Sequence, residues 1–185
     1  SPGAITFGSA RSLSIYFVYV LFFIILWFIF VFKDFKKDAR NYMLFVVIGM
    51  VGLFLADNFT IITKIYTYYL PYQIPFLKWA PLVMPLHFIY SSAVFRFSKL
   101  AKSRKSFFLY SFVFGALFGL VLDSSGTALS FWEYNSNSSL AWFNNVLAIE
   151  LINMPLLAVI TEGIFFLLLI YLATLIKKDF VKYKR

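Results

Sequence analysis

Long apolar runs are the feature of this sequence that most restricts its fold. A run of about 18 or more apolar residues with few charges predicts a membrane-spanning helix, because about 20 helical residues cross a hydrocarbon core ~30 Å thick. The runs do not alternate polar and apolar residues, so we do not expect the strands of a transmembrane barrel. We therefore expect an all-α, polytopic transmembrane helical bundle that forms a single domain over residues 1–185. The expected spans cover residues 12–32, 42–63, 80–97, 106–122 and a last stretch that begins after 142 and ends at 176.

The last stretch is longer than one bilayer crossing requires. Pro155 lies inside it, and a proline removes one hydrogen bond from the helical ladder. We expect Pro155 to kink or split this stretch, which leaves room for a short sixth helix over residues 140–151.

The charged residues predict how the bundle is oriented. The chain has a net charge of +9 and 17 lysines and arginines, most of them in three clusters at residues 33–40, 96–105 and 177–185. Five alternating spans place all three clusters on one side, which the positive-inside rule makes cytoplasmic. We expect an outside N-terminus, a cytoplasmic C-terminus and a plasma or inner membrane location. Lipid headgroups explain these clusters better than nucleic acid, which we exclude as a partner.

Several kinds of site are excluded by composition and motif. The chain has no cysteine and one histidine, which excludes disulfides, thiolate chemistry and an ordinary protein zinc site. It contains no phosphate-binding P-loop, no dinucleotide fingerprint, no paired metalloprotease histidines and no nucleophile elbow. We therefore expect neither a metal nor a cofactor.

A short pattern occurs twice in the chain, 66 residues apart. Each copy consists of an Asp, eight residues, an aromatic residue, one residue and a Tyr, namely Asp57, Tyr66 and Tyr68, then Asp123, Trp132 and Tyr134. Met-Pro-Leu follows each copy, at residues 84–86 and 154–156. We interpret the pattern as a direct repeat of two-helix units, about 42–97 and 106–176, with 12–32 as an extra first helix. Equivalent helices then run in the same direction, so the expected axis between the units lies along the membrane normal.

Acidic residues inside apolar helices are costly and are candidates for function. At a rise of ~1.5 Å per residue, Asp57 and Asp123 lie about 22 and 25 Å from the cytoplasmic ends of their spans, with Glu162 and His87 nearer the middle. We expect these residues to line an outward-facing aromatic and acidic pocket, with Asn153 among the deeper ones. The candidate catalytic residues are Asp57, Asp123 and Glu162, and the candidate substrate-binding residues are Tyr66, Tyr68, His87, Trp132, Tyr134 and Asn153.

Each candidate also has a purely structural interpretation. Asp57 and Asp123 can cap helix ends or hydrogen-bond a loop, His87 can be a packed histidine, and the Tyr and Trp residues can be interfacial anchors. Glu162 is the hardest to interpret in this way, because an acid near the middle of a membrane needs a partner. The expected partner is His87, a Thr or an Asn.

The repeated pattern belongs to two longer segments. They are FGLVLDSSGTALSFWEYNSNSS followed by INMPLLAVITEGIFF, and, less closely, GLFLADNFTIITKIYTYYLPYQIP followed by LVMPLHFIY. These segments resemble the integral-membrane carotenoid proteins, that is, the small lycopene cyclases and the related carotenoid hydratases. The resemblance implies roles for Asp57, Asp123, Trp132, Tyr134 and Pro155. The cyclase pattern has one or two Glu directly after the helix-opening Pro, whereas here Leu156 and Leu157 follow Pro155, and Glu162 comes seven residues after it.

Three classes of function remain open from the sequence. The first is a membrane protein with a pocket for an isoprenoid or other apolar lipid, in which an acid starts cyclisation or hydration as a lyase or isomerase does. The second is a non-enzymatic subunit of a larger membrane complex, with other membrane subunits or a second copy as partners. The third is a small-molecule transporter or its substrate-binding membrane component.

Overall fold

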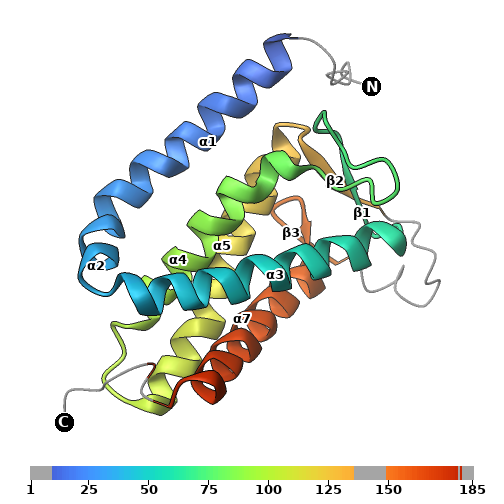
Figure 1. Cartoon of the computed structure of the whole chain (residues 1–185). Coiled ribbons are helices and arrows are strands. Elements are labelled where there is room, and N and C mark those ends of the chain that lie inside the picture. Colours follow the sequence, from blue (N-terminus) through green and yellow to red (C-terminus); the bar gives the residue numbers. More distant parts are fainter. Residues whose placement is uncertain (1–9, 136–148, 179, 181–185) are drawn as a thin grey trace.

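Helices dominate this structure, a computed structural model described for residues 10–135, 149–178 and 180. Figure 1 shows the long helices crossing one another, with α1 at the side of the bundle. The helices are α1 (Ala10–Phe30), α2 (Phe32–Lys37), α3 (Ala39–Ile62), α4 (Met84–Ser98), α5 (Arg104–Ala128) and α7 (Leu156–Ile176), and a 3-10 turn, η1 (Pro81–Val83), precedes α4.

Four helices in the described residues are long and apolar enough to cross a membrane. They are α3, α5, α7 and most of α1 (Leu13–Phe30). The fifth long element, α4, has 15 residues, fewer than the ~20 that cross a hydrocarbon core. Buried residues run along the whole of α4, from Leu86 to Ser98. The structure is thus a helical bundle in which the neighbouring helices enclose α4.

Several helix ends differ from the expected span ends. Helix α5 continues to Ala128, so Asp123 lies inside a helix. Pro155 is the residue before α7, so it does not kink this helix, and the long apolar stretch is divided at this residue. A proline has a fixed φ and no N–H, which suits the start of a helix better than its interior.

The expected sixth helix falls largely on residues outside the described ones. Within the described residues, its last two positions form a strand, β3 (Glu150–Leu151), instead of a helix. This strand pairs in antiparallel fashion with β4 (Met154–Pro155) just before α7 begins. The segment that leads into α7 is therefore a short hairpin.

A two-stranded antiparallel ribbon joins the two halves of the chain. Strand β1 (Tyr66–Tyr68) follows α3, and β2 (Trp132–Tyr134) follows α5. Thr67 pairs with Glu133 at the centre of the ribbon. The sequence placed both segments in loops and did not predict their pairing. We call this end of the bundle the ribbon end.

The three basic segments of the chain meet at the opposite end, which we call the basic end. Lys99 lies between α4 and α5, and its Nζ is 3.0 Å from Asp34 Oδ2 and 2.9 Å from Asp38 Oδ2. Lys177, directly after α7, donates a 2.5 Å hydrogen bond to Asn41 Oδ1. The links after α1, after α4 and after α7 are therefore at the same end, and successive long helices alternate in direction.

Small residues allow the helices to approach closely. Helix α5 packs along α7, and α3 packs along α4. A Cβ atom added at Gly115 would lie 2.9 Å from the Cβ of Phe166, and one added at Gly49 would overlap Ser91 Oγ. Such small-residue contacts are typical of helix pairs in membranes, where packing takes the place of the hydrophobic effect.

We expect the substitution Gly49→Ala to destabilise the protein. The added methyl would overlap Ser91 Oγ and lie 2.8 Å from Ser91 Cβ, and overpacking of this kind costs about 1–3 kcal/mol. The thermal unfolding midpoint in mild detergent measures the loss. In the double variant Gly49→Ala/Ser91→Gly the opposing side chain is absent. Adding Gly49→Ala to Ser91→Gly should therefore lower the unfolding midpoint less than adding it to the wild type does. An unchanged midpoint for Gly49→Ala would show that the two helices are not in close contact.

Candidate functional site

Helices α3 and α5 end in the same way. Each has a non-glycine residue in the left-handed conformation two positions after its last helical residue, Lys64 with φ 58° and Ser130 with φ 59°. In each case the backbone N–H of the following residue donates a 2.9 Å hydrogen bond to the carbonyl oxygen five residues earlier. This closure satisfies helix-end carbonyls and turns the chain sharply. As a result, both strands of the ribbon fold back over the end of the helix that precedes them.

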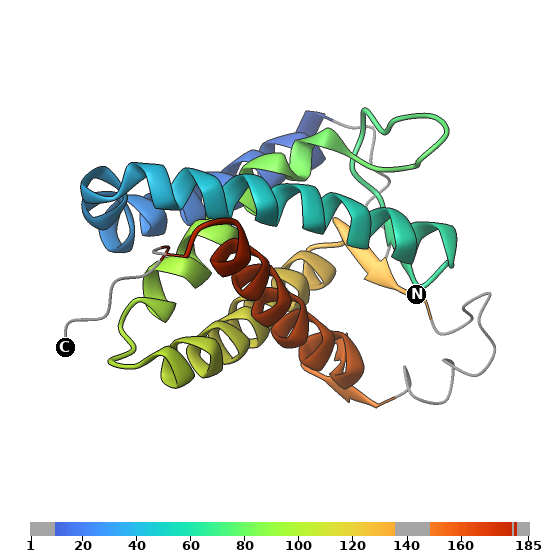
Figure 2. The ribbon, with the colours of Figure 1, turned by 60° about the horizontal axis from the view of Figure 1, so that its bottom comes forward.

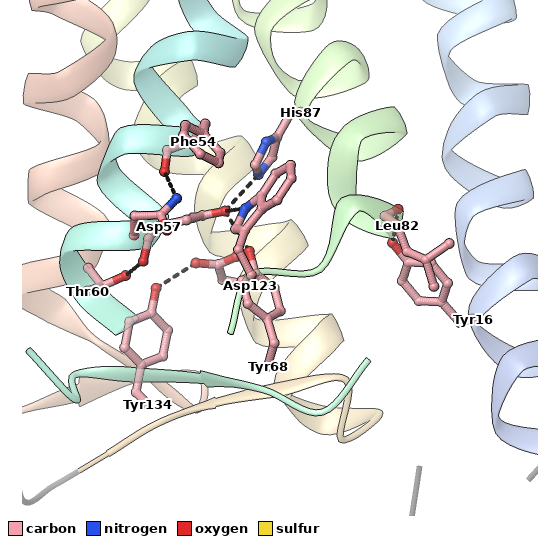
Figure 3. Close-up of polar contacts among 11 residues, drawn as sticks. Tyr16, Phe54, Asp57, Thr60, Tyr68, Leu82, His87, Asp123 and Tyr134 are labelled. Carbon is pink, nitrogen blue, oxygen red and sulfur yellow. Dashed lines mark hydrogen bonds and ion pairs between the residues drawn. The ribbon is translucent and has the colours of Figure 1, made fainter. Parts of the chain in front are cut away.

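The ribbon brings one tyrosine hydroxyl to each repeated aspartate. Tyr68 donates a 2.7 Å hydrogen bond to Asp57 Oδ2, and Tyr134 donates a 2.6 Å hydrogen bond to Asp123 Oδ2. Figure 3 shows both tyrosines pointing from the ribbon toward the helices that carry these carboxylates. Neither aspartate is at a helix end, so neither acts as a helix cap. Each does accept hydrogen bonds from the segment that follows its helix, as the structural interpretation of these residues expects.

One oxygen of Asp57 accepts two hydrogen bonds and lies close to a histidine nitrogen. Besides Tyr68, Trp79 Nε1 donates to Oδ2 at 3.0 Å, and His87 Nε2 lies 3.2 Å from the same atom. His87 comes from the buried face of α4, whereas Trp79 belongs to the loop before η1. A carboxylate with this many donors is well stabilised in an apolar environment.

Asp123 has a different partner, the acid Glu162 of α7. Their carboxyl groups are within hydrogen-bonding reach of each other. Glu162 Oε2 is buried and, within the described residues, has no hydrogen-bond partner. The Glu162 carboxyl group packs directly against Gly119, and a Cβ atom added at Gly119 would overlap Glu162 Oε2. Two charged carboxylates side by side in an apolar cavity would repel each other, so we infer that this pair holds a proton.

These groups line one cavity of about 260 Å³ at the ribbon end. Most of its wall is apolar, and α3, α4, α5, α7 and both ribbon strands contribute to it. Its polar residues are Asp57, Thr60, Tyr66, Tyr68, His87, Tyr90, Asp123, Trp132, Tyr134, Thr161 and Glu162. The cavity thus combines an apolar interior with three carboxyl groups and a histidine.

Three tyrosines separate this cavity from a second, more polar one. Tyr66, Tyr68 and Tyr134 also line a space of about 630 Å³ on the far side of the ribbon, together with Lys64 and Lys78. Burial, followed by the nearby aspartates, raises the pKa of all three tyrosines well above the ordinary value. They therefore stay protonated, and the hydroxyls of Tyr68 and Tyr134 remain hydrogen-bond donors.

The structure brings together eight of the nine residues that the sequence singled out. Asn153 is the exception, and its expected deep position is wrong. It is exposed, with φ 61°, in the turn between β3 and β4, because α7 begins only at Leu156. Within the described residues, no group of three or more His, Asp or Glu side chains is placed to hold a metal ion.

Sequence reasoning missed two residues of the site. Trp79 binds Asp57, yet it lies outside both copies of the repeated pattern, and nothing distinguishes it from an interfacial tryptophan. Tyr90 lies on α4 three residues after His87 and lines the same cavity. The Tyr90 hydroxyl donates a 2.5 Å hydrogen bond to the carbonyl oxygen of Gly115. Because Tyr90 is three residues after His87, the two residues share a helix face. This spacing is the sequence signal that could have identified Tyr90 as part of the site.

We expect Tyr68→Phe and Tyr134→Phe each to lower the free energy of unfolding by about 1.5–3 kcal/mol, the range for hydrogen bonds to charged groups. The loss should be larger for Tyr134→Phe, because Asp57 keeps Trp79 and His87 as partners. Thermal unfolding in mild detergent measures both, and exposed Tyr72→Phe is the matched control. A control that loses as much as the two variants would contradict this account of the ribbon.

Comparisons with protein-family models, curated proteins and solved structures find no match to this chain. The resemblance to the carotenoid proteins therefore stays a prediction that rests on two short segments. Because a fold alone does not determine a function, the function has to be argued from the chemistry of the cavity.

Proposed function

We propose that this chain is an integral membrane protein whose cavity binds one end of an isoprenoid or other long apolar lipid and protonates it. The observation that carries the proposal is the contact between the Asp123 and Glu162 carboxyl groups within a mainly apolar cavity. A shared proton in such a place is available to a bound molecule and shielded from bulk water.

The proposed membrane arrangement has five crossings, with the N-terminus outside and the C-terminus in the cytoplasm of a plasma or inner membrane. The meeting of the basic segments at one end supports it, because clustered lysines and arginines favour the cytoplasmic side. The 15 residues of α4 rise about 22 Å, and the three of η1 add about 6 Å. Together they nearly match a ~30 Å hydrocarbon core, and the cavity then lies toward the outer side.

The proposed arrangement also includes a duplicated two-helix unit. Its support is the equal closure of α3 and α5 at Lys64 and Ser130 and the equal Tyr-to-Asp bonds of the ribbon. At the centre of the ribbon, Thr67 pairs with Glu133, which occupies the equivalent position 66 residues later in the repeat. A local two-fold axis through the ribbon requires its central residue to pair with its own equivalent. The units are about 42–97 and 106–176.

The proposed reaction is an acid-initiated isomerisation or hydration of an alkene. The acid pair transfers its proton to a terminal carbon–carbon double bond, which leaves a carbocation. In cyclisation, a second double bond attacks the cation, a ring carbon–carbon bond forms, and a proton returns to the acid pair. In hydration, water adds to the cation and then loses the proton. Neither route changes the oxidation level, so no electron carrier is needed.

The other cavity residues fit the charge that would develop in this reaction. The rings of Tyr66, Tyr68 and Trp132 line the same space, and aromatic faces stabilise a nearby cation. Asp57 accepts hydrogen bonds from Tyr68 and Trp79 and lies beside His87. Its role in the proposal is electrostatic stabilisation of the cation and not proton transfer.

The proposal also accounts for the departure from the cyclase pattern. That pattern has Glu directly after the helix-opening proline, and this chain has Leu156 and Leu157 there. Glu162 comes about two helical turns later, yet its carboxyl group reaches Asp123 and lines the cavity. The cavity therefore contains a second acid despite the different position along α7.

We expect Glu162→Gln and Asp123→Asn to lower the conversion of an acyclic polyene at least about 100-fold, the lower bound for loss of a general acid. The assay incubates membranes that contain the protein with lycopene in D₂O and separates the products by chromatography. Mass spectrometry should find one solvent-derived deuterium for each initiating proton transfer. The exposed strand residue Glu150 provides the control Glu150→Gln, which should match the wild type.

Two results would contradict parts of this proposal. Full conversion by Glu162→Gln would remove the acid pair from the mechanism. Wild-type protein that retains lycopene without converting it would overturn the reaction and leave the binding function.

A further inference from the structure

One side of the cavity lacks a buried wall. The residues from α4, α5 and the ribbon that line it are mostly buried, among them Leu86, Leu122 and Trp132. On the remaining side, the wall consists of residues from the ribbon-end halves of α3 and α7. There Phe59 is 58% exposed, and Thr161 is exposed as well, although both line the cavity.

Helices α3 and α7 touch toward the basic end and separate toward the ribbon end. A Cβ added at Gly52 of α3 would lie 2.7 Å from Phe165 of α7, and the rings of Phe45 and Phe166 are 6.2 Å apart. Figure 2 shows the two helices diverging from this contact toward the ribbon end. Small side chains, Ala56 and Thr60 on α3 and Ala158 and Thr161 on α7, line the cavity beyond the contact.

The size of the cavity indicates why such an opening is needed. A volume of about 260 Å³ is below the ~300–1,000 Å³ of typical small-molecule sites. A long apolar chain can therefore place one end beside the acids, while the rest must lie elsewhere. The way through the ribbon leads past Tyr66, Tyr68 and Tyr134 into a polar space lined by Lys64 and Lys78, which does not suit an apolar chain.

We infer that an apolar ligand enters the cavity sideways from the membrane, through a portal between the ribbon-end halves of α3 and α7. This inference rests on the proposed function. The reactive end passes between Thr60 and Thr161 to reach the acid pair, and the remainder of the chain stays among the lipid tails. Both helices are among those long and apolar enough to cross a membrane, so the portal opens at the depth of lipid chains and not into water.

The absence of cysteine from the chain permits a clean test by cross-linking. The variant Thr60→Cys/Thr161→Cys, in phosphatidylcholine vesicles, is treated with reducible bis-methanethiosulfonate linkers of increasing length. The probe is cis-parinaric acid, a conjugated polyene fatty acid. Bound probe is quantified by extraction after exchange into probe-free vesicles. The two single-cysteine variants, treated in the same way, control for the reagent.

The order of the two steps decides the outcome. Linking before loading should lower bound probe at least 10-fold, linking after loading should trap it, and reduction of the linker should restore exchange in both cases. Linked protein that loads as fully as unlinked protein would overturn the portal and leave the proposed binding function intact. Wild-type protein that never takes up the probe would overturn both.

A second pair of variants protects the test against a misfolded double mutant. Ala158→Trp places a large side chain in the proposed opening. Ile164→Trp adds the same bulk at an exposed position of α7 that does not line the cavity. The first should slow probe loading at least 10-fold and the second should not. Equal loading rates in the two variants would count against the portal.

Discussion

Carboxyl groups inside an apolar bundle impose the constraint on which the rest of this structure depends. An unpaired buried charge costs several kcal/mol, so each acid must meet donors or share a proton. The ribbon meets part of this requirement, because Tyr68 and Tyr134 each donate to one aspartate. The left-handed turns at Lys64 and Ser130 are what allow the strands to fold back far enough. The turns at the helix ends, the ribbon and the cavity therefore depend on one another, because together they supply donors to the buried carboxyl groups.

The two halves meet the same requirement with different partners. In the first half, Trp79 also donates to Asp57, and His87 Nε2 lies 3.2 Å from the same oxygen. In the second half, the acid Glu162 lies beside Asp123, in place of a second fixed donor. This difference separates a carboxylate surrounded by donors from a pair of neighbouring acids. An asymmetric site has thus formed from a symmetric sequence pattern, which is the physical basis of the two roles proposed above.

Helical spacing explains where the structure places two of the candidate residues. Glu162 and His87 face the cavity because a helix fixes which residues share a face. Asn153 was misplaced, since the start of α7 at Leu156 depends on a short hairpin that apolar content does not reveal. Trp79 was missed for a related reason. Its contact with Asp57 spans an irregular loop, and no periodicity relates the two positions.

The sequence by itself determined the helical bundle and its pairing of acids with aromatic residues. Long apolar runs have few stable alternatives to helices, and the repeated spacing of Asp and Tyr is read directly from the chain. Only the tertiary structure decided which acids meet. The contact of Asp123 with Glu162 depends on α5 approaching α7 closely at Gly119, and the pairing of β1 with β2 joins residues 66 positions apart. Such contacts follow from how whole helices pack, which local sequence does not specify.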